Sequence, residues 1–273
     1  MKLREFLPSW RRAQRLRSGV PAAVGAPLPV VVSLTSIPSR LPYVDLPIRS
    51  VLAQTRPPAL IVLWLHESLR SAIPPRLAAL IGSRVEIRFV SGTSSHRKLV
   101  HALADWPDRV IVTCDDDVMY DPAWLERLWA THERHPRDIV AHEGRLISYG
   151  ADGTLLPYAQ WPWVQEPGNA TPAFLPVGYG GALYPPGALH ADVTDAQQYL
   201  ALAPTADDLW FKAMALRAGT VSRRADDPVP RPIPVVGAKG SALAAVNIRE
   251  DRNRTQWLAL SEAYGVGRLD GTF

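Results

Sequence analysis

The chain has 273 residues, of which 47% are hydrophobic and 21% charged, a balance typical of a folded protein and not of a disordered or membrane-embedded one. No apolar run approaches the roughly 18 to 20 residues that a membrane-spanning helix needs. The formal net charge of +4 favours anionic substrates, nucleic acid or anionic lipid as partners. The single cysteine, Cys114, excludes an intramolecular disulfide and is typical of a reducing compartment, so we expect a cytoplasmic protein.

Residues 1–28 form a basic segment that ends in a linker, VPAAVGAPLP. The segment lacks the apolar core of a secretory signal. Two interpretations stay open: peripheral contact with the inner face of a membrane, with Pro8 interrupting a continuous helix, or a solvated or packed N-terminal helix. The first rests on apolar residues at helical spacing among basic ones: Leu3, Phe6, Leu7 and Trp10 among Lys2, Arg4, Arg11, Arg12, Arg15 and Arg17.

Residues 29–142 alternate between strand-like and helix-like patterns. This alternation predicts parallel strands with right-handed crossovers, in an α/β sheet flanked by helices. Ligands of such sheets bind beyond the carboxyl ends of the strands. The strand-like runs are 29–36, 60–66, 85–90 and 109–114, and the helix-like runs between them are 43–54, 74–82 and 96–105.

Residues 143–273 have a different character, and we interpret them as a second half of the same domain. The stretch up to about residue 187 is dense in Gly, Pro and aromatic residues, with only short strand-like pieces. Helical patterns follow at 191–202 and 206–219, where Gly219 marks a helix end, and again at 254–265.

Three adjacent aspartates, Asp115, Asp116 and Asp117, follow the fourth strand-like run. Carboxylates this close stay ionised only if a cation, hydrogen-bond donors or water compensates them. One solution is a divalent ion that also clamps a diphosphate, since Asp115 and Asp117 share one side of a continued strand and Asp116 takes the other. The other is an exposed acidic turn before a helix capped by Asp121, with Pro122 at its first position. Local spacing does not decide between them.

Four stretches, taken together, resemble the GT-A glycosyltransferases, in particular bacterial family 2-like members. They are VVSLTSIPSRL, HRKLVHAL, VTCDDDVMY with its Asp-x-Asp signature, and GYGGALYPP followed by TADDLWFKA. The resemblance covers roughly residues 29–218. It implies a Rossmann-like, mostly parallel sheet, with a nucleotide-sugar-binding half at 29–142 and an acceptor-binding and catalytic half at 143–273. It also implies a Mn²⁺ or Mg²⁺ ion that bridges the donor diphosphate, with Asp115 and Asp117 as ligands.

The resemblance further implies donor-binding residues on both halves. Each has a plain alternative: a surface charge for Arg40, a polar helix start for Lys98 and a structural turn for the glycines. The implied donor-binding residues are Thr35, Ser36, Arg40, Lys98, Asp115, Asp116, Gly180 and Gly181.

A second acidic pair, Asp207 and Asp208, begins the 206–219 pattern. Thr205 as a cap, and acidic residues in the first turn, explain the pair without any chemistry. The resemblance instead implies an inverting enzyme, in which a carboxylate here deprotonates the acceptor hydroxyl. We predict Asp208 as that base, with Asp207 close behind.

The chain departs from the family pattern in having no His after His190 to complete a metal site. The candidates to replace this His as a metal ligand are Asn247, Asp226, Asp227 and water. Aromatic side chains at Tyr158, Trp161 and Trp163 either stack on sugar faces or belong to the core. We expect Cys114 to pack as a small apolar residue.

The sequence therefore predicts a glycosyltransferase of polysaccharide biosynthesis, acting from a nucleoside-diphosphate sugar to a hydroxyl of a glycan or glycolipid. One alternative is a sugar-nucleotide nucleotidyltransferase, although SLTSIPSRLP lacks the glycine-rich basic loop of that class. The other is a catalytically silent glycan-binding module of the same fold. Basic residues are scattered and not interleaved with aromatics, so no nucleic acid partner is expected.

Overall fold

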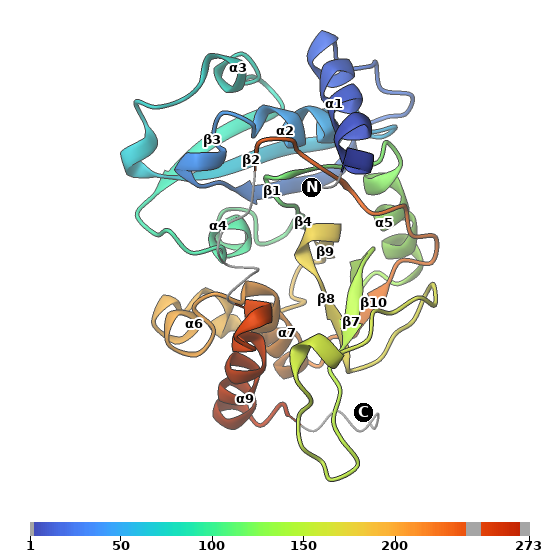
Figure 1. Cartoon of the computed structure of the whole chain (residues 1–273), viewed down its shortest axis with the longest axis vertical. Coiled ribbons are helices and arrows are strands. Elements are labelled where there is room, and N and C mark those ends of the chain that lie inside the picture. The colour runs from blue at the N-terminus through green and yellow to red at the C-terminus, as the bar shows by residue number, and fades with distance from the viewer. Residues whose placement is uncertain (1–2, 239–246, 268–273) are drawn as a thin grey trace.

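The computed structural model describes residues 3–238 and 247–267, and its centre is a seven-stranded sheet (Figure 1). The strand order is β10-β6-β9-β4-β1-β2-β3. These strands span β1 Leu28–Thr35, β2 Pro58–His66, β3 Val85–Val90, β4 Val110–Thr113, β6 Ile139–Ala141, β9 Ala182–Tyr184 and β10 Ser222–Arg224. Two small sheets pair β11 (Ile233–Pro234) with β5 (Val118–Met119), and β7 (Gly144–Leu146) with β8 (Phe174–Pro176).

The sheet is mostly parallel, which confirms the predicted fold class. β1 pairs in parallel with both β2 and β4, β2 with β3, and β6 with β10. The exception is β9, which runs antiparallel between β4 and β6 and was not predicted as part of this sheet. Because β9 and β10 lie beyond residue 143, both halves of the chain contribute to one sheet.

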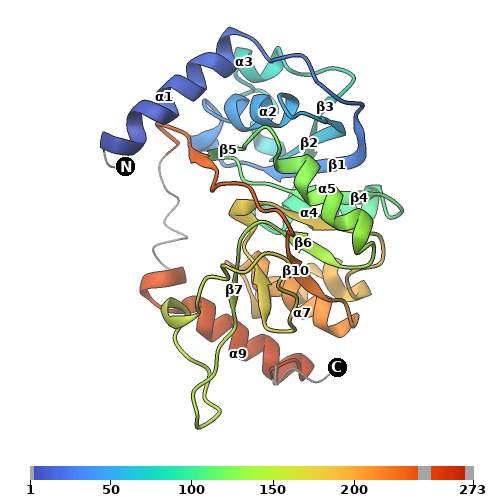
Figure 2. The ribbon, with the colours of Figure 1, turned by 90° about the vertical axis from the view of Figure 1, so that its right-hand side faces the viewer.

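Helices cover both faces of the sheet, as Figure 2 shows. Alternate residues of β1 serve the two cores: Val31 packs in one, and Val30 and Val32 in the other. The helices span α1 Leu3–Ser18, α2 Asp45–Leu52, α3 Pro75–Ala78, α4 Arg97–Asp105, α5 Trp124–Arg134, α6 Ala196–Leu202, α7 Asp207–Arg217 and α9 Arg252–Tyr264. Short 3₁₀ turns occupy Pro38–Arg40, Glu67–Leu69, Tyr158–Gln160, Gly178–Gly180 and Ala191–Thr194. No helix in the described part is long and apolar enough to cross a membrane.

Three details of the helix starts correct the sequence prediction. α5 begins later than expected, and Asp121 accepts a hydrogen bond from the Ala123 N–H without capping the helix. Thr205 does not cap α7, because its hydroxyl is engaged with Asn247 and Gln256. α1 runs continuously through Pro8, which lies near enough to the helix start that few hydrogen bonds are lost.

The Pro-rich segment after β10 returns to the first half of the chain. β11 pairs with β5, directly after the aspartate triplet, and the Val235 N–H donates to the Asp117 carbonyl at 2.8 Å. Val235 and Ala238 also join a small core with Leu16 of α1. This return closes one side of the edge where β1 and β4 end.

Candidate active site

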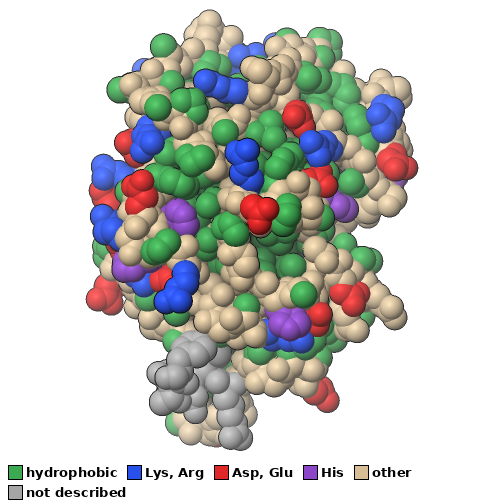
Figure 3. Space-filling model, turned by 180° about the vertical axis from the view of Figure 1, so that it is seen from behind, with side chains coloured by type: hydrophobic (Ala, Val, Ile, Leu, Met, Phe, Trp, Pro, Cys, Tyr) green, Lys and Arg blue, Asp and Glu red, His purple; other side chains and the backbone are tan. Residues whose placement is uncertain are grey.

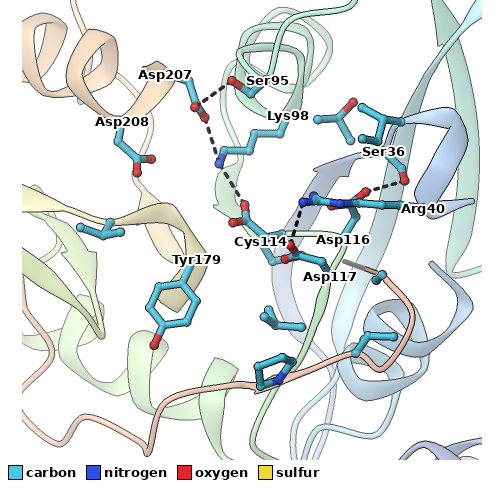
Figure 4. A pocket seen from close by; sticks show the side chains of 18 of the residues that line it. Ser36, Arg40, Ser95, Lys98, Cys114, Asp116, Asp117, Tyr179, Asp207 and Asp208 are labelled. Atoms are coloured by element: carbon cyan, nitrogen blue, oxygen red, sulfur yellow. Dashed lines mark hydrogen bonds and ion pairs between the residues drawn. The ribbon is translucent and has the colours of Figure 1, made fainter. Parts of the chain in front are cut away.

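A cavity of about 1070 Å³ lies at the carboxyl ends of β1 and β4. Figure 4 shows Asp207 and Asp208 on one side, Ser36 and Arg40 on the other, and Lys98 between them. The triplet, the loop after β1, the starts of α4 and α7 and the returning tail all contribute to its lining. The volume is at the upper end of that of ligand sites in proteins, large enough for an elongated ligand.

The topology explains why distant segments meet here. β1 is followed on one side by β2 and β3, whereas β4 pairs on its other side, so the chain changes direction between β1 and β4. A crevice opens at such a switch point. Since β9 runs antiparallel to β4, with Ala182 opposite Thr113, the residues before β9 reach the same edge.

The triplet is compensated by arginine on the β1 side. Arg40 donates to Asp116 at 2.6 Å and pairs with Asp117 at 2.9 Å, and the Ser36 hydroxyl donates to Asp116 at 2.5 Å. Asp116 is buried and Arg40 nearly so. Burial, followed by the charge of Asp115, raises the pKa of Asp117 to about 6. The alternative of a solvated acidic turn does not fit carboxylates held this way.

Lys98 links the two acidic groups. Its ammonium lies 3.1 Å from Asp115 and 2.9 Å from Asp207, although the two aspartates are far apart in the chain. The side chain is buried, which opposes the charged form, but the charges of Asp115 and Asp207 outweigh this and raise the pKa of Lys98 well above its usual value. Lys98 therefore stays cationic at the centre of the cavity.

Asp207 and Asp208 differ in their environments despite being neighbours. Burial opposes ionisation of Asp207, but the charge of Lys98, with hydrogen bonds from Lys98 and Ser95, lowers its pKa. Burial and the charge of Asp207 raise the pKa of Asp208 to about 7. The Asp208 carboxylate accepts a hydrogen bond from the Gly178 N–H at 3.0 Å. A carboxylate poised near neutral pH is suited to proton transfer.

The prediction that Gly180 and Gly181 bind the donor needs correction, because a different glycine of the loop faces the cavity. Gly180 and Gly181 do not line the cavity. A Cβ on Gly180 would meet Glu143 at 2.8 Å, and Gly181, with a φ of +89°, packs against Trp124. Their role is close packing behind the wall. Gly178 instead faces the site, since a Cβ there would lie 2.8 Å from both the Asp208 carboxylate and the Lys98 ammonium.

We expect Gly178→Ala to lower activity by about tenfold or more while changing the free energy of unfolding by less than about 1 kcal/mol. The added methyl group displaces the flexible ends of Asp208 and Lys98 and leaves the core intact. Transfer assays and chemical denaturation measure the two effects. The matched control is Gly82→Ala, because nothing lies within 4 Å of a Cβ there. Full activity in Gly178→Ala would contradict the placement of Asp208 in the site.

The residues present fit a divalent ion only with help from a ligand. In residues 3–238 and 247–267, no group of three or more His, Cys, Asp or Glu side chains is arranged to hold a metal. Asp115 and Asp117 are both partly exposed in the cavity, at 30% and 29%. Mg²⁺ commonly uses one or two carboxylates together with substrate phosphates and water. Burial raises the pKa of Asp117 first, and the charge of Asp115 adds to the rise, a repulsion that a dication between the two carboxylates would relieve.

The remaining candidates divide between the cavity and the rest of the molecule. Thr35, Tyr158 and Asn247 line the cavity, and Asn247 also donates to the Thr205 carbonyl. Asp226 and Asp227 do not line it and pair with Arg134 and Arg127 of α5, so they are wrong as metal ligands for this cavity. Trp161 is buried in the core, whereas Trp163 lies against the guanidinium groups of Arg145 and Arg231. Cys114 is fully buried, and burial raises the pKa of its thiol.

Several residues that shape the site were not predicted. Ser95 donates to Asp207 at 2.8 Å, and the Tyr120 hydroxyl accepts from the Asp115 N–H and donates to the Tyr179 carbonyl. The tail residues 234–238 line the cavity. For Ser95 a signal existed, since it directly precedes His96 and lies three residues before Lys98 in a polar run, but nothing in the sequence pairs it with position 207.

A mostly parallel sheet flanked by helices, with an acidic cavity at its topological switch point, defines an α/β protein of the GT-A type. The family described as Glycosyl transferase family 2 matches residues 44–176, just under half of the chain. The predicted resemblance to family 2 GT-A glycosyltransferases is thereby confirmed, and this region holds the triplet, Lys98 and the loop up to β8.

Solved structures are similar to the chain at low sequence identity, and the first of those that follow supports the fold. The crystal structure of S. aureus TarS 1-349 is 12% identical, with a TM-score of 0.50, over 87% of this chain and 72% of that one. CMP:2-keto-3-deoxy-manno-octonic acid synthetase complexed with CTP is 14% identical, with a TM-score of 0.46, over 85% and 98%. The 4-diphosphocytidyl-2C-methyl-D-erythritol synthase of Anaerococcus prevotii DSM 20548 is 10% identical, with a TM-score of 0.45, over 84% and 94%. No curated protein matches the chain.

Proposed function

We propose that the protein transfers a sugar from a nucleoside-diphosphate sugar to a hydroxyl of a glycan or glycolipid acceptor, with inversion at the anomeric carbon. The observation that carries the proposal is the arrangement of two acidic groups across one cavity, the triplet and the α7 pair, bridged by Lys98. Residues 29–142 supply the donor side and residues 143–273 the acceptor side of one domain.

On the donor side, Arg40 and Lys98 place two cationic groups beside Asp115 and Asp117. Guanidinium and ammonium groups suit a diphosphate, and Ser36 holds Asp116 so that Arg40 stays at the cavity edge. Asp115 and Asp117 would hold Mn²⁺ or Mg²⁺, which supplies Lewis-acid stabilisation of the leaving diphosphate when bound.

On the acceptor side, Asp208 takes the proton from the acceptor hydroxyl. The hydroxyl oxygen then forms a bond to the anomeric carbon as the bond from that carbon to the diphosphate oxygen breaks, and the nucleoside diphosphate leaves as an anion. Attack from the face opposite the leaving group inverts the anomeric configuration. Asp207, held by Lys98 and Ser95, keeps its charge and so keeps the pKa of Asp208 high enough for this proton transfer.

A screen of nucleoside diphosphates and their sugars by thermal shift, with and without Mn²⁺, tests donor binding. At a ligand concentration about one hundred times Kd, binding to the folded state stabilises by about 2.7 kcal/mol, or roughly 5 °C for a domain of this size. We expect Asp117→Asn to remove the Mn²⁺-dependent part of the shift, and Asp226→Asn, outside the cavity, to retain it. Equal shifts in wild type and Asp117→Asn would refute the cation site.

Product analysis separates the rival functions. A nucleotidyltransferase would release pyrophosphate from a nucleoside triphosphate and a sugar phosphate, and a silent glycan-binding module would bind sugars without turnover. The loop after β1 has no glycine and forms a 3₁₀ turn at Pro38–Arg40. It therefore lacks the glycine-rich backbone that would bind a triphosphate, which argues against the nucleotidyltransferase. Release of nucleoside diphosphate from a sugar donor supports the proposal.

A further inference from the structure

One face of α1 is fixed to the body of the protein. The Ser9 hydroxyl donates to the Pro234 carbonyl, Arg12 donates to the Tyr120 carbonyl at 3.0 Å, and Leu16 is buried in a core with Val235. Near the end of the helix, Arg17 pairs with the buried Asp45 at 3.0 Å. The helix is therefore packed against the body from Ser9 to Arg17, which fits the simpler of the two interpretations of this segment.

The N-terminal part of the same helix carries apolar side chains that stay partly exposed. Phe6, Leu7 and Trp10 are 39%, 52% and 49% exposed, and they lie within one turn on the same side of the helix. Arg11 and Arg15, also exposed, continue the helix surface beside them. An exposed apolar stripe bordered by basic residues is a candidate interaction surface. On the face of the molecule that Figure 3 shows, charged side chains are scattered among the others.

The stripe adjoins the mouth of the cavity. Phe6 is both exposed and part of the cavity lining, and so is Ile248, at 44% exposure, which precedes α9. Figure 2 shows the N-terminal half of α1 and the start of α9 on the same side of the molecule. Arg249, next to Ile248, is exposed as well. Apolar side chains of two elements far apart in the chain thus border the opening, and exposed arginines follow them closely in the sequence.

We propose that this face, defined by Phe6, Leu7, Trp10 and Ile248 with Arg11, Arg15 and Arg249, docks on an anionic lipid bilayer, so that the cavity opens toward the membrane surface. Apolar side chains enter the headgroup boundary and arginines contact anionic headgroups in helices that lie in the interface plane. The pairing of an apolar stripe with positive charge fits such a surface better than a neutral protein partner.

Docking in this orientation narrows the acceptor class, a step that rests on the proposed function. An acceptor hydroxyl carried on a lipid headgroup would reach Asp208 from the membrane side, past Phe6 and Ile248, without leaving the bilayer. The cavity would then take its soluble donor along the Arg40 side and its lipid-linked acceptor at the mouth.

Co-sedimentation with vesicles tests the docking face. We expect the full chain to bind vesicles of equal parts phosphatidylcholine and phosphatidylglycerol, more weakly as salt is raised, and to bind pure phosphatidylcholine far less. Leu7→Ser with Trp10→Ser should weaken binding to the mixed vesicles about tenfold or more. Arg11→Gln with Arg15→Gln should weaken it about tenfold and flatten the salt dependence.

The matched controls are Leu200→Ser on α6, 51% exposed, and Arg76→Gln on α3, which should bind vesicles like the wild type. Donor thermal shifts should be unchanged in Leu7→Ser with Trp10→Ser, because neither residue lines the cavity. If the wild type binds no sugar-nucleotide donor, the proposed function is refuted, whereas vesicle binding would still support the docking face.

Three results would overturn the docking proposal. The first is that the wild type does not bind anionic vesicles, and the second is that the stripe variant, Leu7→Ser with Trp10→Ser, binds them as tightly as the wild type. The third is that Leu200→Ser weakens vesicle binding as much as the stripe variant does. If the stripe is instead covered by a second copy of the chain, sedimentation velocity will show a dimer that the stripe variant converts to monomer, without vesicle binding.

Discussion

Replacing Asp208 by Asn is expected to lower kcat by about 10² to 10⁴-fold, the range that a positioned general base contributes, while donor binding stays as in the wild type. Asn has nearly the same shape and still accepts the hydrogen bond from the Gly178 N–H, but it cannot take the proton of the acceptor hydroxyl. Steady-state transfer kinetics and the donor thermal shift measure the two quantities on the same protein.

The pH profile makes the assignment specific. Burial and the neighbouring charge raise the pKa of Asp208 to about 7, and a base acts only when ionised, so kcat/KM should rise with pH through about 7 and then level off. Asp207→Asn removes the negative charge that raises this pKa and frees Lys98 to approach Asp208. The rise should therefore move to lower pH in Asp207→Asn.

The matched control is Asp108→Asn, at an exposed position before β4 and at the opposite edge of the sheet. It should leave both kcat and the pH profile unchanged. Transfer that persists in Asp208→Asn with the wild-type pH profile would show that another group takes the proton. Loss of activity in Asp207→Asn, with activity kept in Asp208→Asn, would assign the general base to Asp207.

The first half of the fold follows from sequence pattern, and so do the helices of the second half, whereas the short strands of the second half do not. The predicted runs at 29–36, 60–66 and 85–90 match β1, β2 and β3 closely, because buried parallel strands are continuous apolar runs rich in β-branched residues. β9 escaped prediction because it has only three residues and takes its place between β4 and β6 through tertiary pairing. Short strands carry too little periodicity to be recognised.

The candidate site shows the same limit. Position in the chain indicated that Asp115 and Asp117 would end a strand at the ligand-binding edge, and Lys98, Arg40 and Asp208 do line the same cavity. Which residues pair could not be predicted, because Lys98 meets Asp207 only through the packing of α4 and α7 around the sheet. The glycine loop failed for a related reason: Gly178–Gly180 forms a 3₁₀ turn, in which successive residues point in different directions, so Gly178 reaches Asp208 while Gly180 packs on Glu143.

Replacing Lys98 by Met should destabilise the fold by about 3 kcal/mol near neutral pH, because it leaves the buried Asp207 carboxylate without its counter-ion. The ammonium contacts Asp115 at 3.1 Å and Asp207 at 2.9 Å, and methionine fills the space without the charge. Without Lys98, burial raises the pKa of Asp207, so the Asp207 carboxylate takes up a proton more readily. The destabilisation should therefore shrink as pH falls and grow as pH rises, which urea denaturation across pH measures.

Lys212→Met is the same substitution at an equally buried lysine, but here we expect no loss of stability. Lys212 of α7 is 2% exposed, and the contact of its ammonium is with the Ser222 hydroxyl at 3.4 Å, so burial lowers its pKa to about 7. In the unfolded chain the pKa is that of a free lysine, so the cost of burying Lys212 grows as pH falls from about 10 to about 7. Methionine removes this cost, and Lys212→Met should equal or exceed the stability of the wild type below pH 10. Equal destabilisation by the two variants would mean that packing, and not the charges around Lys98, governs both sites.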